Sequence, residues 1–342
     1  MAKPTVHDIA KAAGVSLATV DRVLNARPGV RARTIARVQD AVSRLGYVRD
    51  CHAANLARQR QYRFAFVLPE GPGQFVGTLR RAVAEAIAAQ QGERLSASIV
   101  SVAVNDPHEI ARRLRSVRPD RHDGVALLVP ETPQVRDAIA HLKNAGLAVV
   151  ALASDLPHSA RDYFVGIDNR SAGRTAGVLM GRFAGHRAGR ILVVTNSLQA
   201  RDSLERRLGF DEVIGSEFPQ LRPLPTVESY DDPDRMAGIA RRAAAASAEI
   251  VGVYSMGAGN EPLLRGLRSA GRLGTLTVIA HELTPVTRQA LIDREVDVLI
   301  TQNAGHLVRS ALRVLRAKTD GMPIFEAQER IRTDIVIREN LP

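Results

Sequence analysis

Two short helical patterns joined at a glycine lie near the N-terminus, and no other feature constrains the fold of this sequence as strongly. Val6, Ile9, Ala10 and Ala13 recur at i, i+3, i+4 and i+7, the spacing of one apolar helix stripe. Gly14 follows directly and suits a left-handed C-cap, which ends a helix sharply. The pattern therefore predicts a short amphipathic helix and an abrupt turn.

A second helical pattern begins after this turn, with Ser16 as its capping residue. Val20, Val23 and Leu24 form an inward apolar stripe. The outer face then carries Leu17, Ala18, Asp21, Arg22 and Asn25. Such a short helix after a tight turn is typical of a helix-turn-helix that enters the DNA major groove. An ordinary helical hairpin is the alternative.

A third amphipathic pattern follows over residues 31–45 and ends at Gly46, so three helices can share one small core. Residues 1–60 hold eleven Lys or Arg and four Asp or Glu, a net charge of +7. The whole chain carries +11, which leaves +4 for all later residues. Positive charge concentrated in the three-helix segment is expected of a surface that contacts phosphates.

The stretch TVHDIAKAAGVSLATVDRVLN (5–25) resembles the N-terminal signature of the lactose-repressor (LacI) family of bacterial transcription regulators. LGYVRD (45–50) is similar to the end of that signature, and Ala53–Ala57 resembles the family's hinge helix. The resemblance implies that the hinge orders on operator DNA and that Leu56 inserts into the minor groove.

The resemblance also implies a set of DNA contacts. Leu17, Ala18 and Arg22 would face base edges, with Arg22 placed for a bidentate guanine contact. The other residues expected to bind DNA, the first four of them at phosphates, are Ser16, Thr19, Asn25, Thr34, Thr5, Ala53 and Leu56. Asp21 and Asp50 depart from the family pattern and place negative charge near DNA. Asp21 would orient Arg22 or accept from a cytosine amino group, and the operator sequence is not carried over from relatives.

Composition constrains the rest of the chain. Its 342 residues, 45% of them hydrophobic, are enough to form a sizeable core. The single cysteine, Cys51, and the lack of an apolar run of membrane length favour a reducing, aqueous compartment. The N-terminus has no apolar signal core, so a cytoplasmic protein is expected.

From residue 62 onward, short apolar runs alternate with helical patterns, which predicts parallel strands buried on both faces. The expected strands are Phe64–Leu68, Ser98–Val104, Val125–Val129, Ala148–Ala153, Ile191–Thr195, Ile250–Tyr254, Thr277–Ala280 and Val296–Thr301. Thr78–Gln90, Pro107–Val117 and Pro133–Ala145 are among the expected helices. The number of units favours an α/β effector domain of two doubly wound lobes, in addition to the small all-α head.

This region resembles the type 1 periplasmic sugar-binding proteins, which implies two lobes joined by three crossings with a small effector in the cleft between them. The expected domains are a DNA-binding head at 1–48, a hinge at 49–62 and an effector domain at 63–340. Within the effector domain, 63–168 and 303–328 would form the N-lobe, and 169–302 and 329–340 the C-lobe.

Ligands of such folds bind at the carboxyl ends of the strands, and a sugar requires carboxylates, amides and an apolar surface there. The effector-binding candidates are Gln74, Phe75, Asp155, Arg201, Asp202, Asn260, Glu282 and Gln302. In related sugar binders, the positions resembling Asp155, Glu282 and Gln302 contact the ligand. Other roles remain open: a turn cap for Asp155, surface ion pairs for Arg201 and Arg206, and loop hydrogen bonds for Gln302.

The stretch Val165–Asn169 resembles a crossing between lobes, so Asp168 and Asn169 are expected to fix that connection, and Arg174 to be structural or interfacial. We find no nucleophile elbow, P-loop, dinucleotide fingerprint or metal-ligand spacing, and expect neither cofactor nor metal. The leading hypothesis is a homodimeric, ligand-controlled transcription regulator, expected to be a repressor. A solute-binding protein or a sugar-acting enzyme of the same fold is the alternative.

Overall fold

The computed structural model describes residues 4–24, 27–47, 60–71, 73–89, 94–103, 105–230, 232–246, 249–257 and 259–342. The chain divides into two compact units, residues 1–60 and 61–342. The division falls inside the connection that the sequence predicts at 49–62. None of the helices in the described ranges is long and apolar enough to cross a membrane.

Unit 1 is a three-helix domain, with α1 at Val6–Ala13, α2 at Leu17–Leu24 and α3 at Ala32–Leu45. Its core is formed by Ile9, Ala13, Val20, Val38 and Ala41. Val6, which the sequence places on the apolar stripe, is instead 38% exposed, because the stripe is wider than the face that α3 covers.

The turn between α1 and α2 is fixed at both ends. Gly14 adopts φ +60° and ψ +43°, and its N–H donates to the carbonyls of Ala10 and Lys11. The Arg37 guanidinium of α3 donates to the Gly14 carbonyl at 3.3 Å and also to the Ala13 carbonyl. A left-handed glycine and an interhelical hydrogen bond together set the angle between the first two helices.

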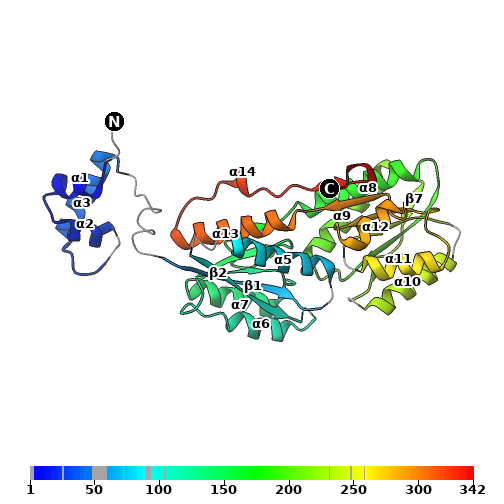
Figure 1. The fold of residues 1–342 in the computed structure, drawn as a ribbon, viewed down its shortest axis with the longest axis horizontal. Coiled ribbons are helices and arrows are strands. Elements are labelled where there is room, and N and C mark those ends of the chain that lie inside the picture. Colours follow the sequence, from blue (N-terminus) through cyan, green and yellow to red (C-terminus); the bar gives the residue numbers. More distant parts are fainter. Residues whose placement is uncertain are drawn as a thin grey trace. The chain divides into compact units, whose positions relative to one another are not determined.

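Unit 2 contains two mainly parallel sheets (Figure 1). The first has the order β2-β1-β3-β4-β5, with all neighbours parallel. The second has the order β12-β11-β10-β9-β6-β7; β8 also pairs with β6, and β12 is antiparallel to β11. The strands are β1 (Tyr62–Pro69), β2 (Leu95–Val102), β3 (Gly124–Leu127), β4 (Ala148–Leu152), β5 (Tyr163–Val165), β6 (Gly189–Thr195), β7 (Leu221–Pro223), β8 (Val227–Glu228), β9 (Ile250–Ser255), β10 (Thr277–His281), β11 (Val298–Thr301) and β12 (Asp334–Val336).

Helices cover both faces of each sheet, as in a doubly wound fold. They are α5 (Gln74–Ala89), α6 (Pro107–Arg115), α7 (Pro133–Asn144), α8 (Asn169–Ala184), α9 (Arg201–Glu217), α10 (Pro233–Ala246), α11 (Asn260–Ser269), α12 (Pro285–Ile292), α13 (Ala304–Asp320) and α14 (Glu326–Glu329), with a 3-10 turn at Arg338–Asn340. Alternate residues of β1 serve two cores. Phe64 and Phe66 pack with α5 and α13, whereas Ala65 and Val67 pack with α6 and α7. The central strand is thus buried on both faces, as its uninterrupted apolar run predicts.

The chain passes between the two sheets three times: from β5 to α8, from β11 to α13, and from α13 to β12. Figure 1 shows α13 lying along the first sheet beside α5, although about 230 residues separate them in sequence. The α/β two-lobed fold and all eight predicted strands are confirmed, with end points that differ by a few residues. The sequence analysis missed β5, β7, β8 and β12.

Candidate functional site

The outer face of α2 is the candidate nucleic-acid interface. Leu17, Ala18 and Arg22 are exposed, as the sequence predicts. The hydroxyls of Ser16 and Thr19 lie 2.9 Å apart, and the Thr19 N–H donates to the Ser16 oxygen at 3.2 Å. Small and apolar side chains around one long cation give a surface that fits a groove rather than a protein core.

The Asp21 carboxylate on this face forms an ion pair with Arg27 at 3.3 Å, and not with Arg22. The cation of Arg27 offsets a charge that would otherwise repel phosphate, and Arg22 remains exposed. Thr5 accepts from the N–H of Asp8, and its own hydroxyl and N–H donate to the Asp8 carboxylate, so it caps α1. The predicted contacts Asn25, Ala53 and Leu56, together with Asp50 and Cys51, lie outside the described residues.

A cavity of about 490 Å³ lies between the two sheets of unit 2, within the size range of small-molecule sites. Both lobes contribute to its wall. Among the predicted effector residues, the cavity is lined by Gln74, Phe75, Asp202, Asn260, Glu282 and Gln302. They follow β1, β6, β9, β10 and β11, so the strand-end argument brings residues more than 200 positions apart to one place.

Arg206 of α9 lies at the centre of the cavity wall and is 2% exposed. Its Nε donates to Asn169 Oδ1 at 2.9 Å, and Nη1 donates to the Met256 carbonyl at 2.7 Å. Nη2 lies 3.9 Å from Asp202 Oδ2 and 4.0 Å from Glu282 Oε1. Arg206 is thus held in one orientation by protein acceptors, and it links the two carboxylates of the wall.

Glu282 is a buried carboxyl with an unusual backbone, at φ +74° directly after β10. Burial raises the pKa of Glu282 to about 7, while Arg206 and the hydrogen bond from Gln302 Nε2 at 3.2 Å oppose the rise. Left-handed backbone at a residue other than glycine costs about 1–3 kcal/mol and is found mostly at functional sites. The position of Glu282 in the cavity wall therefore lowers stability in two ways, through its left-handed backbone and through the burial of its carboxyl.

Asn260 is held rigidly by its neighbours. Its Oδ1 accepts from the Ser255 hydroxyl at 2.6 Å, and its Nδ2 donates to the His281 carbonyl at 2.9 Å. Behind it, the Tyr254 hydroxyl and His281 Nε2 lie 2.9 Å apart, and burial lowers the pKa of His281 well below its usual value. This neutral network supports the strand ends that carry Asn260 and Glu282.

Polar atoms in the cavity wall that lack a hydrogen-bond partner among the described residues include the Oε1 of Gln302 and the hydroxyl of Ser229, in side chains that are 7% and 1% exposed. An unpaired buried polar group costs about 1–3 kcal/mol, so both atoms favour a ligand that supplies hydrogen bonds.

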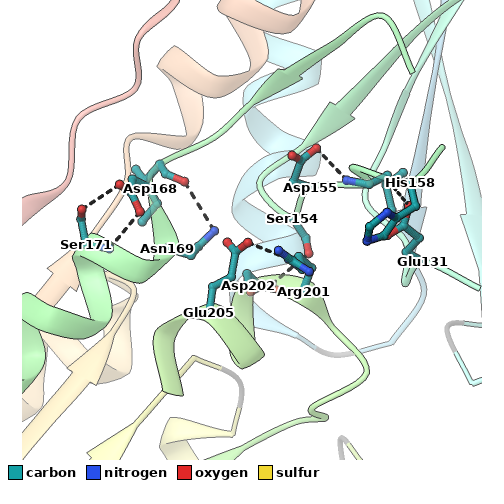
Figure 2. A network of polar contacts seen from close by, with 12 residues as sticks. Glu131, Ser154, Asp155, His158, Asp168, Asn169, Ser171, Arg201, Asp202 and Glu205 are labelled. Carbon is teal, nitrogen blue, oxygen red and sulfur yellow. Dashed lines mark hydrogen bonds and ion pairs between the residues drawn. The ribbon is translucent and has the colours of Figure 1, made fainter. Parts of the chain in front are cut away.

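Asp155 and Arg201 are not among the residues that line this cavity; Figure 2 shows both of them in polar contacts. The Asp155 carboxylate pairs with Arg161 through both oxygens and accepts from the N–H of Leu156. Arg201 Nε donates to Glu205 at 2.6 Å, one turn along α9. Asp155 and Arg201 thus each lie near the end of a strand, but their side chains bind neighbouring residues of the same loop or helix.

The predicted crossing also behaves as a structural connection. Asp168 caps α8 by accepting from the N–H and the hydroxyl of Ser171, at 2.9 and 2.7 Å, as Figure 2 shows. Asn169 Nδ2 donates to the Ala153 carbonyl at 3.3 Å, and its Oδ1 accepts from Arg206. Arg174 donates to Ser171 at 2.9 Å.

Direct polar contacts join the lobes beside the cavity. The N–H of Asp202 donates to the Ser154 hydroxyl at 3.3 Å, and Asn169 connects Arg206 to Ala153 at the end of β4. These few hydrogen bonds are the contacts that a change in lobe orientation would alter.

Arg206, Ser154 and Ser229 line the cavity but were not among the effector-binding candidates predicted from the sequence. The available signal for Arg206 was its place one turn after Asp202 and one turn before Phe210, whose ring is stacked on Tyr254. A helix face shared with a buried aromatic residue points to the interior. Among the described residues, no group of three or more His, Cys, Asp or Glu side chains could hold a metal ion.

Two family profiles match this sequence. Residues 5–50 match the family described as bacterial regulatory proteins, lacI family, and residues 64–323 match the periplasmic binding protein domain. Among curated proteins, the HTH-type transcriptional regulator DegA of Bacillus subtilis is 26% identical over 176 residues, which is 51% of this chain and 50% of DegA. The match therefore spans about half the length of that relative, which is a regulator by name and not an enzyme.

Solved structures match the fold of unit 2. GanP, a glucose-galactose binding protein from Geobacillus stearothermophilus, superimposes with a TM-score of 0.73 at 18% identity, over 83% of this chain and 99% of GanP. An ABC transporter solute binding protein from Burkholderia graminis, solved with D-arabinose, gives a TM-score of 0.74 at 21% identity, over 82% and 96%. At these identities the likeness shows the fold alone.

Proposed function

The chain belongs to the lacI family of bacterial regulatory proteins and carries a periplasmic binding protein domain, and we propose that it is a DNA-binding transcription repressor controlled by a small sugar-like effector. One observation carries the proposal: a helix-turn-helix with an exposed reading face and an interlobe cavity with both apolar and polar lining residues occur in the same chain. A solute-binding protein has no use for a helix-turn-helix that reads DNA.

The cavity supports an uncharged polyhydroxy effector. Its wall carries the carboxylates of Glu70, Asp202, Asp232, Glu261 and Glu282 but only two guanidinium groups, those of Arg206 and Arg265. Arg206 is already engaged by protein acceptors, so a phosphate or carboxylate on the effector would meet more repulsion than attraction. Carboxylate and amide groups beside the Phe75 ring suit the hydroxyls and the apolar face of a sugar.

Control of DNA binding would follow from differential affinity. An effector that contacts Gln74 and Phe75 of one lobe and Asp202 and Glu282 of the other binds only one lobe arrangement well. The effector therefore shifts the population of molecules toward that lobe arrangement. DNA binding rises if this is the arrangement that holds DNA, and falls if the other one is.

We further propose a homodimer that works in the cytoplasm, where bacterial chromosomal DNA is found. A single helix-turn-helix reads only a few base pairs, and two heads related by two-fold symmetry read a palindromic operator about one helical turn apart. In this arrangement, Leu17, Ala18 and Arg22 contact base edges, and Ser16, Thr19 and Thr34 contact phosphates.

Fluorescence anisotropy with fragments of the DNA upstream of the gene, against a random duplex of equal length, tests this function. Arg22→Ala should remove about 1–3 kcal/mol of discrimination while binding to the random duplex persists. Arg44→Ala, which removes an equally exposed charge paired with Asp40 at the end of α3, serves as the control and should retain discrimination. Equal discrimination by the Arg22 variant and wild type would exclude the reading face that we assign.

A thermal-shift screen of neutral pentoses, hexoses and polyols against the corresponding sugar phosphates tests the effector class. A binding sugar raises the melting temperature by linkage. Stabilisation by the phosphates alone would contradict the charge argument.

A further inference from the structure

The positive charge of unit 2 is concentrated at the end of its first sheet that lies opposite the cavity. This end is formed by the residues before β1, β2 and β3 and by the last turns of α6 and α13; we call it the linker-side face, because β1 begins there, directly after the connection to the head. Among the described residues of unit 2, the charged residues of this face are Arg63, Arg94, Arg115, Arg118, Asp120, Arg121, Asp123, Arg316, Lys318 and Asp320.

These residues carry seven positive and three negative charges, a net of +4, which equals the net charge of residues 61–342 as a whole. The cavity, at the carboxyl ends of the strands, has five carboxylates and two arginines in its wall. The basic residues of the linker-side face thus lie at the end of the first sheet away from the carboxylates of the cavity wall, where the chain enters from the head.

Several cations of this face are available to a partner. Arg94, Arg115, Arg121 and Lys318 are exposed and form no ion pair within the described part of the chain. Arg118 pairs only with Asp120, and its side chain is 69% exposed. Exposed cations that lack acidic partners are the groups that bind phosphates, because contact releases condensed counterions.

Side-chain contacts hold the segments of the linker-side face together. The Tyr62 hydroxyl donates to Asp320 at 2.7 Å, and the Arg316 guanidinium lies 5.0 Å from the centre of the Tyr62 ring. Arg63 donates to the Asp120 carbonyl at 2.8 Å, and the Arg63 N–H donates to Asp123. The start of β1, the loop before β3 and the end of α13 are thereby tied into one surface.

We propose that the linker-side face is a second, sequence-independent DNA-binding surface, which contacts phosphates flanking the site that the head reads. This inference rests on the proposed function. Residues 48–59 connect the two units, and a fully extended chain of this length spans at most about 45 Å. DNA held by the head is therefore always within reach of the face from which the connection starts, and the sign of the charge is complementary.

The test compares full-length proteins on a random 40-base-pair duplex, with the salt dependence of the affinity as the readout. The triple variant Arg115→Gln, Arg121→Gln, Lys318→Gln removes three unpaired cations of the face. The control, Arg182→Gln, Arg241→Gln, Arg242→Gln, removes three exposed cations of the C-lobe and changes the net charge equally.

On B-DNA, the slope of log K against log salt changes by about 0.9 for each phosphate that the protein neutralises. We expect the face variant to show a slope shallower by about 0.9 for each phosphate that it no longer binds, and an affinity at low salt about tenfold or more below that of the control. Equal slopes for the two triple variants would overturn the inference while leaving the proposed function intact. If wild type fails to bind the duplex at low salt, the proposed function fails and the inference with it. Loss of binding to phosphatidylserine vesicles without loss of binding to DNA would assign the face to a membrane and overturn the proposal.

Discussion

At the scale of single residues, the cavity depends on one buried ionisable group. Glu282 lies within 4.0 Å of Arg206 Nη2 and accepts a hydrogen bond from Gln302, yet burial still raises its pKa to about 7. Because the guanidinium is shared with Asp202 and two neutral acceptors, it compensates the Glu282 charge only in part.

Glu282→Gln is therefore expected to change stability in a pH-dependent way. The pKa of Glu282 is higher in the folded state than in the unfolded state. The contribution of Glu282 to the stability of wild type, as a free energy of unfolding, is therefore fully present below about pH 4.5, where Glu282 is protonated in both states, and is lost as the pH rises through 7. A shift of this size corresponds to roughly 3 kcal/mol. The variant should gain stability relative to wild type between pH 5 and pH 8, measured by urea unfolding at each pH.

Glu261→Gln removes an exposed carboxylate from the wall of the same cavity and is the control for this measurement. A stability difference between Glu282→Gln and wild type that stays constant from pH 5 to pH 8 would contradict the raised pKa.

At the scale of secondary-structure elements, the sequence predicts the long buried strands from their uninterrupted apolar runs and the short helices of the head from their apolar period. It does not predict β5, β7, β8 and β12, which have two or three residues and are half-exposed, so neither a run nor a period can develop. Elements of this length form because a neighbouring strand is already in place.

The same distinction explains the effector candidates. Strand-end position explains why Asn260, Glu282 and Gln302 all line one cavity, because parallel strands end together. It cannot decide how a side chain turns after the strand end. The Asp155 side chain binds Arg161 of the same loop, and the Arg201 side chain binds Glu205 one turn along the same helix.

The packing of α8 against α9 places Arg206 and gives a second prediction. A Cβ at Gly173 of α8 would lie 2.0 Å from the Arg206 carbonyl oxygen, and one at Gly209 would lie 2.0 Å from the Arg170 carbonyl oxygen. The two helix backbones are therefore as close as glycine permits. Gly173→Ala should separate them, lower stability by about 1–3 kcal/mol or more, and displace Arg206 from the cavity wall.

Gly215→Ala provides the matched control within α9, because a Cβ there meets no atom within 4 Å. Replacing an exposed helical glycine should raise stability by about 0.5–1 kcal/mol. Thermal unfolding and sugar affinity of both variants check the prediction. Similar effects of the two substitutions would mean that the close approach of α8 and α9 does not control the site.

At the scale of the whole molecule, the sensing and the DNA reading that we propose fall in two separate compact units. The head has its own core around Ile9, Val20 and Val38, and the effector domain has three cores of its own. The proposed function requires coupling between units that share no core residues. That coupling would run through the connection and through DNA, which we propose that both units contact, and not through a common hydrophobic interior.

This division predicts two thermal transitions in differential scanning calorimetry. At about 0.7 kcal/mol per residue, the head accounts for an unfolding enthalpy of about 40 kcal/mol and the effector domain for about 200 kcal/mol. Ile9→Ala removes a fully buried side chain of the head and should lower only the small transition. Leu127→Ala does the same in β3 and should lower only the large one. A bound sugar should raise only the large transition, whereas the random DNA duplex should raise the small transition and, through the linker-side face, the large one as well, because each ligand stabilises the units that hold it. A single transition that moves with either substitution would show that the units unfold together, and the coupling between sugar and DNA would then have to run through direct contact between them.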